Sequence, residues 1–417
     1  MNILDDLQWR GLIQDSTDLD ALRAHLDAGA ATFYVGFDPT GASLHVGHLT
    51  QVLTARRLQQ AGLRPLLLVG GATGMIGDPK ESSERVLNSP DVVASWVDRI
   101  REQVRPFVTY TGDNAATLVN NLDWTGKMDV VDFLRDVGKH FPVNKMLARE
   151  VVKARLESGI SFTEFSYQLL QANDYFELNR KHGCSLQFGG SDQWGNITAG
   201  VDYVRRRAAA QVHAFVTPLV TKADGTKFGK TEGDAVWMDA EMTSPYAFYQ
   251  FWINADDRDV GTYLRYFSFK SHDEILELEQ ATVDAPAARR AQRALAEELT
   301  TLVHSEKECE QVVAASLALF GRGELDQLEA ATLESALREA GLTAVEGDLP
   351  SAASAFKSTG LAKSLSDARR TVAEGGAYVN NVRVSDPDAP LTDDQLLYGR
   401  FAVLRRGRKT IAGLTRS

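Results

Sequence analysis

Cysteine is scarce in this chain of 417 residues. Its two cysteines, Cys184 and Cys309, lie far apart in the sequence and show none of the spacings that hold zinc. Neither a disulfide framework nor a structural metal is expected, and two free thiols fit a reducing compartment. Long apolar runs are also absent, and the first residues, MNILDDLQWRGL, are acidic where a signal peptide would be basic. These absences predict a soluble cytoplasmic protein that does not enter membranes.

An overall excess of positive charge is lacking as well. The formal net charge is −11, which argues against a protein whose entire surface attracts nucleic acid. The charge is uneven, because residues 350–417 hold eleven Lys or Arg against six Asp or Glu. That segment therefore carries +5 and the remainder −16. A basic segment at the end of an acidic chain indicates a polyanionic partner for that segment.

The hydrophobic pattern predicts an α/β fold. TFYVGF (32–37) is typical of a buried strand, LTQVLTARRLQQAG (49–62) of a helix ended by glycine, and RPLLLVGGATG (64–74) of a second strand. Strand, helix and strand in about forty residues form a βαβ unit, so we expect a Rossmann-like parallel sheet covered by helices. A third glycine-rich stretch occurs at 185–200. Each glycine cluster follows a strand, at the edge where open α/β sheets bind ligands.

Changes in pattern divide the chain. We expect a Rossmann-like domain over residues 1–220, with a helical segment inserted near 129–159. Residues 221–320 would hold a glycine-containing loop and then a helical domain, because the pattern from Tyr246 to Phe320 is mostly helical. The acidic stretch 321–349 is predicted to be a linker, and residues 350–417 a small α+β domain.

Two histidines stand where the first helix of the βαβ unit begins. His45 and His48 follow Asp38-Pro39-Thr40-Gly41 and are separated by Val46 and Gly47. Such a pair is often a polar surface or core feature, and a zinc pair is disfavoured because no third ligand is evident. Their place at a helix N-terminus, where backbone N–H groups attract phosphate, favours a triphosphate site instead.

A lysine pair occurs in a glycine-containing loop further along the chain. Lys227 and Lys230 flank Phe228 and Gly229, and Asp224-Gly225 precede them. A solvated basic turn is the alternative for an isolated pair. Beside a phosphate-binding helix terminus, two ammonium groups on a flexible arm would instead close over a triphosphate.

These two segments carry a family resemblance. HVGH (45–48) resembles the HIGH signature of class I aminoacyl-tRNA synthetases, and KFGKT (227–231) resembles their second, lysine-rich signature. Further blocks, including YVGFDPT, LVGGATGMIGDP, FSYQLLQANDY and LQFGGSDQWGNI, are similar to bacterial-type tyrosyl-tRNA synthetases over nearly the whole length. The resemblance implies a ligase of protein biosynthesis acting on L-tyrosine, ATP and tRNA(Tyr). Magnesium would accompany ATP, and no tightly bound prosthetic group is implied.

The resemblance also implies a role for individual residues. Catalytic roles fall on Thr40, His45, His48, Lys227, Lys230 and Thr231. Tyrosine would be bound by Tyr34 and Asp174 at its phenol, by Asp78, Tyr167 and Gln171 at its ammonium, by Gln193 at its carboxylate and by Thr73 at the edge of this group. ATP would be bound by Gly36, Asp38, Gly47, Arg85, Gly190 and Asp192.

Several of these assignments have plainer alternatives. Tyr167, Gln171 and Asp174 share a helical face by their spacing, which a polar helix surface would also explain. The loop KESSER (80–85) departs from the family pattern, since it is short and offers only Lys80 and Arg85 as cations. A tryptophan-specific relative and an RNA-binding paralogue without activity are the competing functions. Tyr34 with Asp174 argues against the first, and both phosphate motifs argue against the second.

The basic end of the chain resembles a small RNA-binding module shared with a ribosomal protein. GLAKSLSDARRTVAEGGAYVNNVRV (360–384) places Arg369 and Arg370 on a short helix before a Gly-Gly turn. A solvated helix face is the alternative, but clustered arginines also contact phosphates. Arg205–Arg207 form a second, weaker candidate patch. The resemblance further implies a homodimer that contacts through residues 129–159, with one tRNA bridging both subunits.

Overall fold

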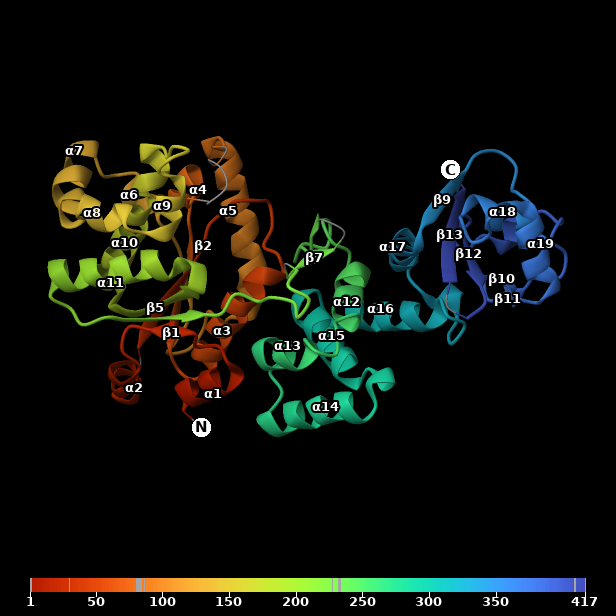
Figure 1. Cartoon of the computed structure of the whole chain (residues 1–417), viewed down its shortest axis with the longest axis horizontal. Helices are drawn as coiled ribbons and strands as arrows, with labels where there is room; N and C mark the ends of the chain where they lie inside the picture. The colour runs from red at the N-terminus through yellow and green to blue at the C-terminus, as the bar shows by residue number, and fades with distance from the viewer. Residues whose placement is uncertain are drawn as a thin grey trace. The chain divides into compact units, whose positions relative to one another are not determined.

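In the computed structural model, residues 2–29, 31–79, 85, 87–226, 228–231, 234–408 and 410–416 are described. The chain forms two compact units (Figure 1). The first contains Met1–Asp239 and Gly261–Ile275, and the second contains Ala240–Val260 and Leu276–Ser417. The sequence places the first boundary at residue 220, whereas in the structure residues 221–239 and 261–275 pack with the sheet domain.

A six-stranded sheet forms the centre of the first unit. The strands lie in the order β1-β6-β5-β2-β3-β4, and all neighbours are parallel except β1 and β6. From β2 the chain runs outward through β3 to β4, and it then returns to add β5 and β6 on the other side. The strand order therefore reverses between β2 and β5, and this is where open α/β sheets bind ligands. The strands are β1 (Asp15–Ser16), β2 (Thr32–Phe37), β3 (Arg64–Val69), β4 (Thr117–Asn120), β5 (Cys184–Gly190) and β6 (His213–Thr217).

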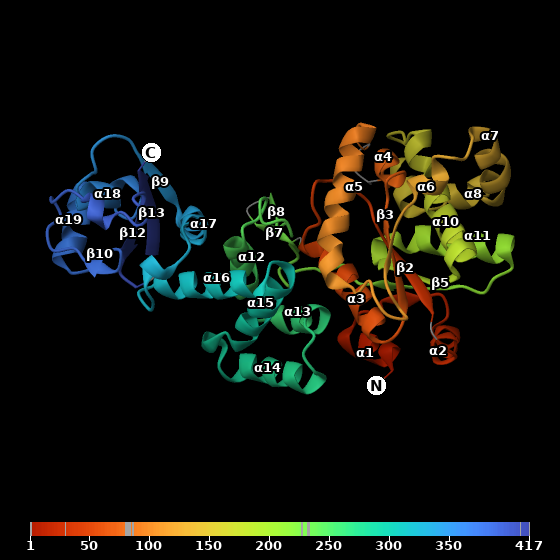
Figure 2. The same ribbon diagram turned by 180° about the vertical axis from the view of Figure 1, so that it is seen from behind.

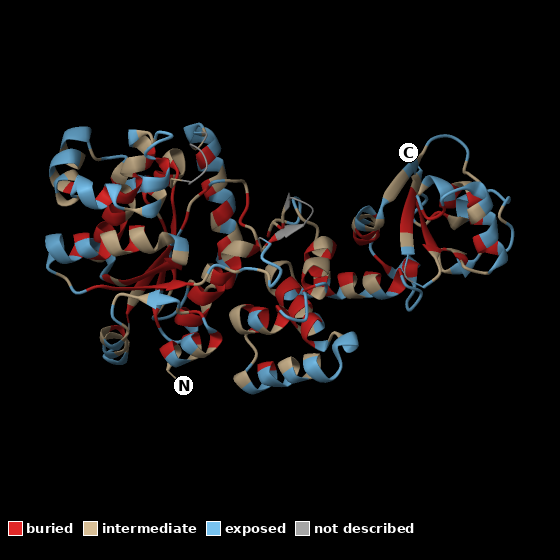
Figure 3. Cartoon of the chain, in the orientation of Figure 1, coloured by how far each residue is buried: buried red, intermediate tan, exposed pale blue. Residues whose placement is uncertain are grey.

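Helices cover both faces of this sheet, which confirms the predicted α/β class. Helices α10 (Phe162–His182) and α11 (Trp194–Ala208) lie on one face, and α3 (Leu49–Gln60) and α5 (Pro90–Val104) on the other (Figures 1 and 2). The central strands are accordingly buried along almost their full length (Figure 3), which explains their continuous apolar sequences. Helix α10 is delimited by Ser161, whose side chain accepts the N–H of Glu164, and by Gly183 in the left-handed region.

The segment near 129–159, which the sequence predicts to be an inserted helical segment, comes directly before α10 in the chain. It consists of short turns, because Pro142 interrupts the helical pattern and leaves no element longer than six residues. These turns are α7 (Val130–Asp132), a π-turn (Phe133–Val137), a 3₁₀ turn (Gly138–His140), α8 (Val143–Leu147) and α9 (Glu150–Arg155). This unit also contains α1 (Ile3–Arg10), α2 (Leu19–Asp27), α4 (Thr73–Ile76), α6 (Leu122–Thr125), nearly all of α13 (Val260–Phe267) and the first residues of α14 (His272–Asp284).

The second unit combines helices with a five-stranded sheet. Its sheet has the order β11-β10-β12-β13-β9, and four of these strands lie within residues 350–417, where the sequence predicts a small α+β domain. Its helices are α12 (Pro245–Ile253), α15 (Arg290–Val303), α16 (Glu306–Ala318), α17 (Ala330–Ala340), α18 (Ala352–Ser358), α19 (Leu365–Ala373) and most of α14 (His272–Asp284). Its strands are β9 (Leu342–Val345), β10 (Ala377–Val379), β11 (Val382–Arg383), β12 (Phe401–Arg406) and β13 (Thr410–Arg416).

The predicted linker over 321–349 is wrong, because this stretch is folded. It contains α17, which buries Leu333, Ala336 and Leu337, and β9, which pairs in parallel with β13. The acidic composition of the stretch hides a single apolar stripe at helical spacing, so a reading of mean polarity misses it.

Candidate active site

One cavity opens at the carboxyl ends of β2 and β5, at the point where the strand order reverses. Its volume is about 700 Å³. It brings together most of the residues that the sequence assigns to the site: Tyr34, Gly36, Asp38, Thr40, His45, Gly47, His48, Thr73, Asp78, Arg85, Tyr167, Gln171, Asp174, Gly190, Asp192 and Gln193. Lys227, Lys80 and the side chains of Lys230 and Thr231 lie outside the described residues, but their neighbours Gly225, Thr226 and Phe228 line the same cavity.

The two histidines form a compact turn at the mouth of α3. His45 caps a short 3₁₀ turn (Val46–His48), and its Nδ1 accepts the N–H of Gly47 at 3.0 Å. His48 Nδ1 accepts the N–H of His45 at 3.2 Å, and the ring centroids are 4.1 Å apart. Because each Nδ1 accepts a hydrogen bond, each neutral ring carries its proton on Nε2. Burial lowers the pKa of His48 to about 3, so this ring stays uncharged near neutral pH.

Position 47 must be glycine because the His45 ring lies directly against it. A Cβ at this position would meet His45 Cε1 at 2.7 Å and Nδ1 at 2.9 Å. The sequence resemblance assigns Gly47 to ATP binding. In the structure, the His45 ring occupies the space in which a side chain at this position would lie. The glycine thus allows the imidazole to fold back over the turn.

Asp38 lies at the centre of a buried hydrogen-bonded cluster. Its carboxylate accepts from Thr73 Oγ1 at 2.6 Å and from Tyr167 OH at 2.6 Å. Burial raises the pKa of Asp38 to about 6, and the two donors oppose that rise. A Cβ on Gly70 would meet Asp38 Oδ1 at 2.1 Å, so the glycine after β3 makes room for the cluster. Residues assigned separately to nucleotide and to tyrosine are therefore in direct contact.

Asp174 projects into the same cavity from α10. Its carboxylate accepts from Trp124 Nε1 at 2.8 Å and from Asn121 Nδ2 at 3.0 Å. Burial raises the pKa of Asp174 to about 8 in spite of these donors. Asn121 and Trp124, which come soon after β4, are not among the residues that the sequence predicts for the site, and no local pattern marks them. By contrast, the buried Tyr34 hydroxyl has no hydrogen-bond partner among the described residues.

Asp78 is the third hydrogen-bonded carboxylate of the cavity, after Asp38 and Asp174. It accepts from Gln193 Nε2 at 2.9 Å and from Asn196 Nδ2 at 3.1 Å, and burial raises its pKa. Asn196 on α11 was also missed from the sequence. Gln171 Oε1 is buried without a hydrogen-bond partner among the described residues. Asp78, Gln171 and Tyr167 thus offer acceptor oxygens to a cation such as an ammonium group.

The two glycines assigned to nucleotide approach differ in their surroundings. A Cβ on Gly190 would meet Asp192 Oδ1 at 2.5 Å, so Gly190 makes room for that carboxylate. A Cβ on Gly36 would make only an ordinary contact of 3.7 Å with Leu68. Asp192 also accepts from Gln193 Nε2 at 3.0 Å.

The lysine-rich loop is joined to the histidine turn by main-chain hydrogen bonds. Val46 N–H donates to the Val236 carbonyl at 2.9 Å, and Met238 N–H donates to the Leu44 carbonyl at 2.8 Å. Val236 N–H in turn donates to the Gly229 carbonyl at 2.9 Å, which closes the hairpin of β7 (Lys230–Thr231) and β8 (Asp234–Ala235). Two motifs far apart in sequence therefore share one backbone ladder.

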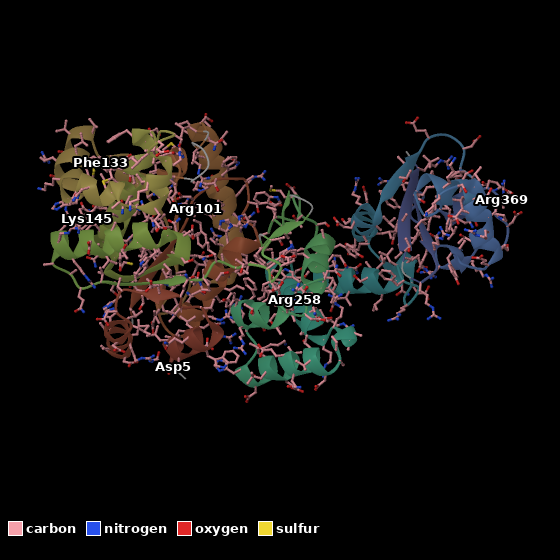
Figure 4. The ribbon with its side chains drawn as sticks, viewed as in Figure 1. Asp5, Arg101, Phe133, Lys145, Arg258 and Arg369 are labelled. Carbon is pink, nitrogen blue, oxygen red and sulfur yellow. The ribbon has the colours of Figure 1, made fainter. Side chains whose placement is uncertain are left out.

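The basic segments show how their arginines are used. Arg369 pairs with Asp388 and Arg370 with Asp367, each at 2.8 Å, and both guanidinium groups remain at least half exposed. Arg369 lies on the outer side of α19 (Figure 4). In the first unit, Arg205 donates to the Val212 carbonyl and Arg207 stacks over Phe176. Arg369 and Arg370 are thus open to a polyanion, while Arg205 and Arg207 also serve the local fold.

No group of three or more His, Cys, Asp or Glu side chains is placed to hold a metal ion in the described part of the chain. No helix among the described residues is long and apolar enough to cross a membrane.

Comparison with known proteins identifies the class. Residues 27–321 match the family model described as tRNA synthetases class I (W and Y). The structure also resembles the C-terminally truncated mitochondrial tyrosyl-tRNA synthetase of Aspergillus nidulans, with a TM-score of 0.68 and 32% identity over 75% of this chain and 92% of that one. The tryptophanyl-tRNA synthetase of Plasmodium falciparum shares the fold, with a TM-score of 0.56 at 13% identity over 79% of this chain and 87% of that one. The chain is thus a class I aminoacyl-tRNA synthetase.

Sequence similarity then separates the two members of that group. The tyrosine–tRNA ligase of Streptomyces griseus is 62% identical over 99% of this chain and 98% of the relative, and that of Thermobifida fusca is 57% identical over 99% of each. Residues 336–412 match the C-terminal domain described as tyrosine–tRNA ligase SYY-like. The chain therefore belongs to the tyrosine–tRNA ligases, which confirms the predicted family.

Proposed function

We propose that the cavity joins L-tyrosine to tRNA(Tyr) in two steps. The tyrosine carboxylate attacks the α-phosphate of ATP, which gives tyrosyl-adenylate and releases pyrophosphate. A hydroxyl of the 3′-terminal adenosine of the tRNA then attacks the tyrosyl carbonyl, and AMP leaves. Neither step needs a protein nucleophile, so positioning and electrostatic stabilisation must supply the rate. The observation that carries this proposal is that one cavity contains the hydrogen-bonded carboxylates of Asp38, Asp78 and Asp174 together with the histidine turn.

Tyrosine would lie between the carboxylates of Asp174 and Asp78. Its phenol would meet Tyr34 and Asp174, and its ammonium would meet Asp78, Tyr167 and Gln171. The Tyr34 hydroxyl and Gln171 Oε1, which have no hydrogen-bond partner in the described part of the chain, support this placement, because a buried polar atom without a partner is costly until a ligand satisfies it. Gln193 would hold the substrate carboxylate, and Thr73 would lie at the edge of the group.

ATP would occupy the end of the cavity at the histidine turn. Thr40 and His45 would contact the γ-phosphate, and His48 the ribose or adenine, with Asp38 and Asp192 as further nucleoside contacts. The backbone at Gly36 would lie close to the nucleotide, whereas Gly47 and Gly190 make room for the His45 ring and the Asp192 carboxylate. Arg85, Lys227, Lys230 and Thr231 would stabilise the departing pyrophosphate. Mg²⁺ would enter with ATP, held mainly by phosphate oxygens and water.

A second copy of the chain would cover the inserted segment. Large apolar side chains are exposed along this segment and at the first residue of α10, and such a patch is a mark of an interface. They are Val130, Val131, Leu134, Val143, Leu147, Leu156 and Phe162. Figure 4 labels Phe133 and Lys145 within this segment. We therefore propose a homodimer.

We also propose that residues 350–417 bind tRNA through their excess of positive charge. The enzyme would work in the cytoplasm, where its two buried cysteines stay reduced.

ATP–pyrophosphate exchange tests the activity. We expect exchange with tyrosine and none with tryptophan or without an amino acid. Exchange with tryptophan would favour the tryptophan-specific relative, and no exchange with either would favour an RNA-binding paralogue. The variant that combines His45→Ala with Lys230→Ala should lose exchange. Exchange that is unchanged in this variant would contradict the site assignment.

A further inference from the structure

Glu164 occupies an unusual place in the first turn of α10. Ser161 and Glu164 have the spacing of a capping box, in which the glutamate side chain returns to the backbone of the capping serine. Only half of that box forms, because Ser161 Oγ accepts the Glu164 N–H at 3.3 Å while the Glu164 carboxylate turns inward. Its residue is 1% exposed. Burial of a carboxylate costs free energy unless partners inside the protein compensate for the lost water.

The Glu164 carboxylate interacts with two partners. Oε1 accepts the backbone N–H of Arg85 at 2.8 Å, and Oε2 lies 3.2 Å from Arg155 Nη1. Arg155 is itself buried, and it also donates through Nε and Nη2 to the Gly159 carbonyl at 3.2 and 3.0 Å. Arg155 thus supplies the opposite charge that a buried carboxylate needs. The carboxylate then remains able to hold Arg85, which belongs to a different segment.

Arg85 connects this pair to the cavity. Its side chain lines the cavity, and its Nε donates to the Asp78 carbonyl at 3.0 Å. Its stem lies against Gly77, which has φ +82°, where an added Cβ would come within 2.9 Å of Arg85 Cγ. Glu164 fixes the backbone of Arg85, and Asp78 and Gly77 fix its side chain. The Arg85 side chain is therefore fixed at its backbone and at its guanidinium group.

We propose that Glu164 is a positioning residue for phosphate binding, acting through the main chain of Arg85. The proposal rests on the proposed function, in which Arg85 meets the pyrophosphate portion of ATP. Reach and charge have separate parts in this arrangement. The length of the side chain allows Oε1 to hold the Arg85 N–H, whereas the negative charge serves Arg155.

Two conservative substitutions separate reach from charge. Glu164→Gln keeps the length and an amide oxygen for the Arg85 N–H but loses the charge, and Glu164→Asp keeps the charge but is one methylene shorter. In ATP–pyrophosphate exchange we expect Glu164→Asp to raise the KM for ATP and for pyrophosphate by about tenfold, the size typical of one lost hydrogen bond that orders a charged group. Glu164→Gln should change both values by less than about threefold while lowering stability to urea, because Arg155 loses its counter-charge. The KM for tyrosine should change much less than the KM for ATP, because Arg85 contacts Asp78 at its main-chain carbonyl. The Asp78 carboxylate, which is proposed to meet the tyrosine ammonium, is held separately by Gln193 and Asn196.

A double-mutant comparison completes the test. Glu164→Asp added to Arg85→Ala should raise the KM for ATP no further than Arg85→Ala alone. The inference is overturned if the KM for ATP follows charge, so that Glu164→Gln is the damaging change, or if the two substitutions add. It is also overturned if Arg85→Ala leaves the KM for ATP unchanged, although exchange with tyrosine would then still support the proposed function. Absence of tyrosine-dependent exchange in the unmodified enzyme would reject the function itself.

Discussion

Tyr34 and Asp174 line the same cavity but differ in how their polar atoms are satisfied. Asp174 accepts hydrogen bonds from Asn121 and Trp124, whereas the Tyr34 hydroxyl is buried without a partner among the described residues. In the proposed phenol-binding pair, Asp174 is thus fixed by hydrogen bonds within the protein, whereas the Tyr34 hydroxyl is left to bond the substrate.

Tyr34→Phe should therefore separate stability from selectivity. Removal of an unsatisfied buried hydroxyl should raise the free energy of unfolding of the ligand-free protein by about 1 kcal/mol. The same change removes a partner of the substrate phenol, so the preference for tyrosine over phenylalanine in kcat/KM should fall by about tenfold. Urea unfolding and exchange with both amino acids measure the two effects. A variant that is less stable and equally selective would contradict the assignment of Tyr34.

The pH dependence of activation should follow Asp38 and not His48. Burial raises the pKa of Asp38 to about 6 and lowers that of His48 to about 3. Asp38 thus gains a proton as the pH falls through 6, while His48 stays neutral throughout. We expect kcat/KM for ATP to decline below pH 6, and His48→Gln to lower activity without moving this decline. Loss of the decline in His48→Gln, or its persistence in Asp38→Asn, would count against this prediction.

Asp174 should make stability fall as the pH rises. Its pKa is about 8 in the folded protein and about 3.9 in an unfolded chain. Between these values the folded state holds a proton that the unfolded state has released, so unfolding becomes easier by at most about 1.4 kcal/mol per pH unit. Asp174→Asn lacks this term, so its stability relative to the unmodified protein should improve from pH 5 to pH 8. A difference in urea unfolding that does not vary with pH would refute this.

Gly229 and Gly225 provide a matched pair in the lysine-rich loop. Both have positive φ, +75° and +79°, so alanine costs about 1–2 kcal/mol of backbone strain at either site. An added Cβ at Gly229 would lie 2.8 Å from Val46 Cγ2, whereas at Gly225 it would meet no atom of the described residues within 4 Å. Gly229→Ala should displace the loop and lower kcat for exchange by about tenfold to a hundredfold, and Gly225→Ala by much less. Val46→Ala should partly restore Gly229→Ala; equal effects at the two glycines would show that contact with Val46 is unimportant.

The dimer contact can be tested in the same matched way. Phe162 is 71% exposed beside the inserted segment, and Val283 is 75% exposed at the end of α14. Phe162→Asp should give monomers at micromolar concentration in analytical ultracentrifugation, because it puts a charge into an apolar interface. Val283→Asp should leave the dimer intact. Dimers that survive Phe162→Asp would move the contact elsewhere.

The parts of the site that follow single strands were predictable from sequence. β2, β3 and β5 each have a short apolar run with glycine at or near its end, so the residues after them, such as Asp38 and Asp192, could be placed at one edge of a parallel sheet. The histidine turn was predictable for the same reason.

Residues that complete the site through tertiary contact were not predictable. Asn121, Trp124 and Asn196 reach the carboxylates from elements whose local pattern gives no hint of a ligand site. Likewise, β9 is a strand only because β13 pairs with it in parallel, and a strand of four residues in an acidic stretch has little signal of its own. Such features depend on neighbours far away in sequence.

The ladder between residues 44–46 and 236–238 consists of main-chain atoms alone. Exchange of side chains therefore leaves it intact, unless proline removes a donor such as the N–H of Val46 or Met238. A change in chain length between Gly229 and Val236 would act differently, because it would shift every later partner by one position. Tyrosine–tRNA ligases with this architecture should thus tolerate wide variation in the composition of this stretch and very little in its number of residues.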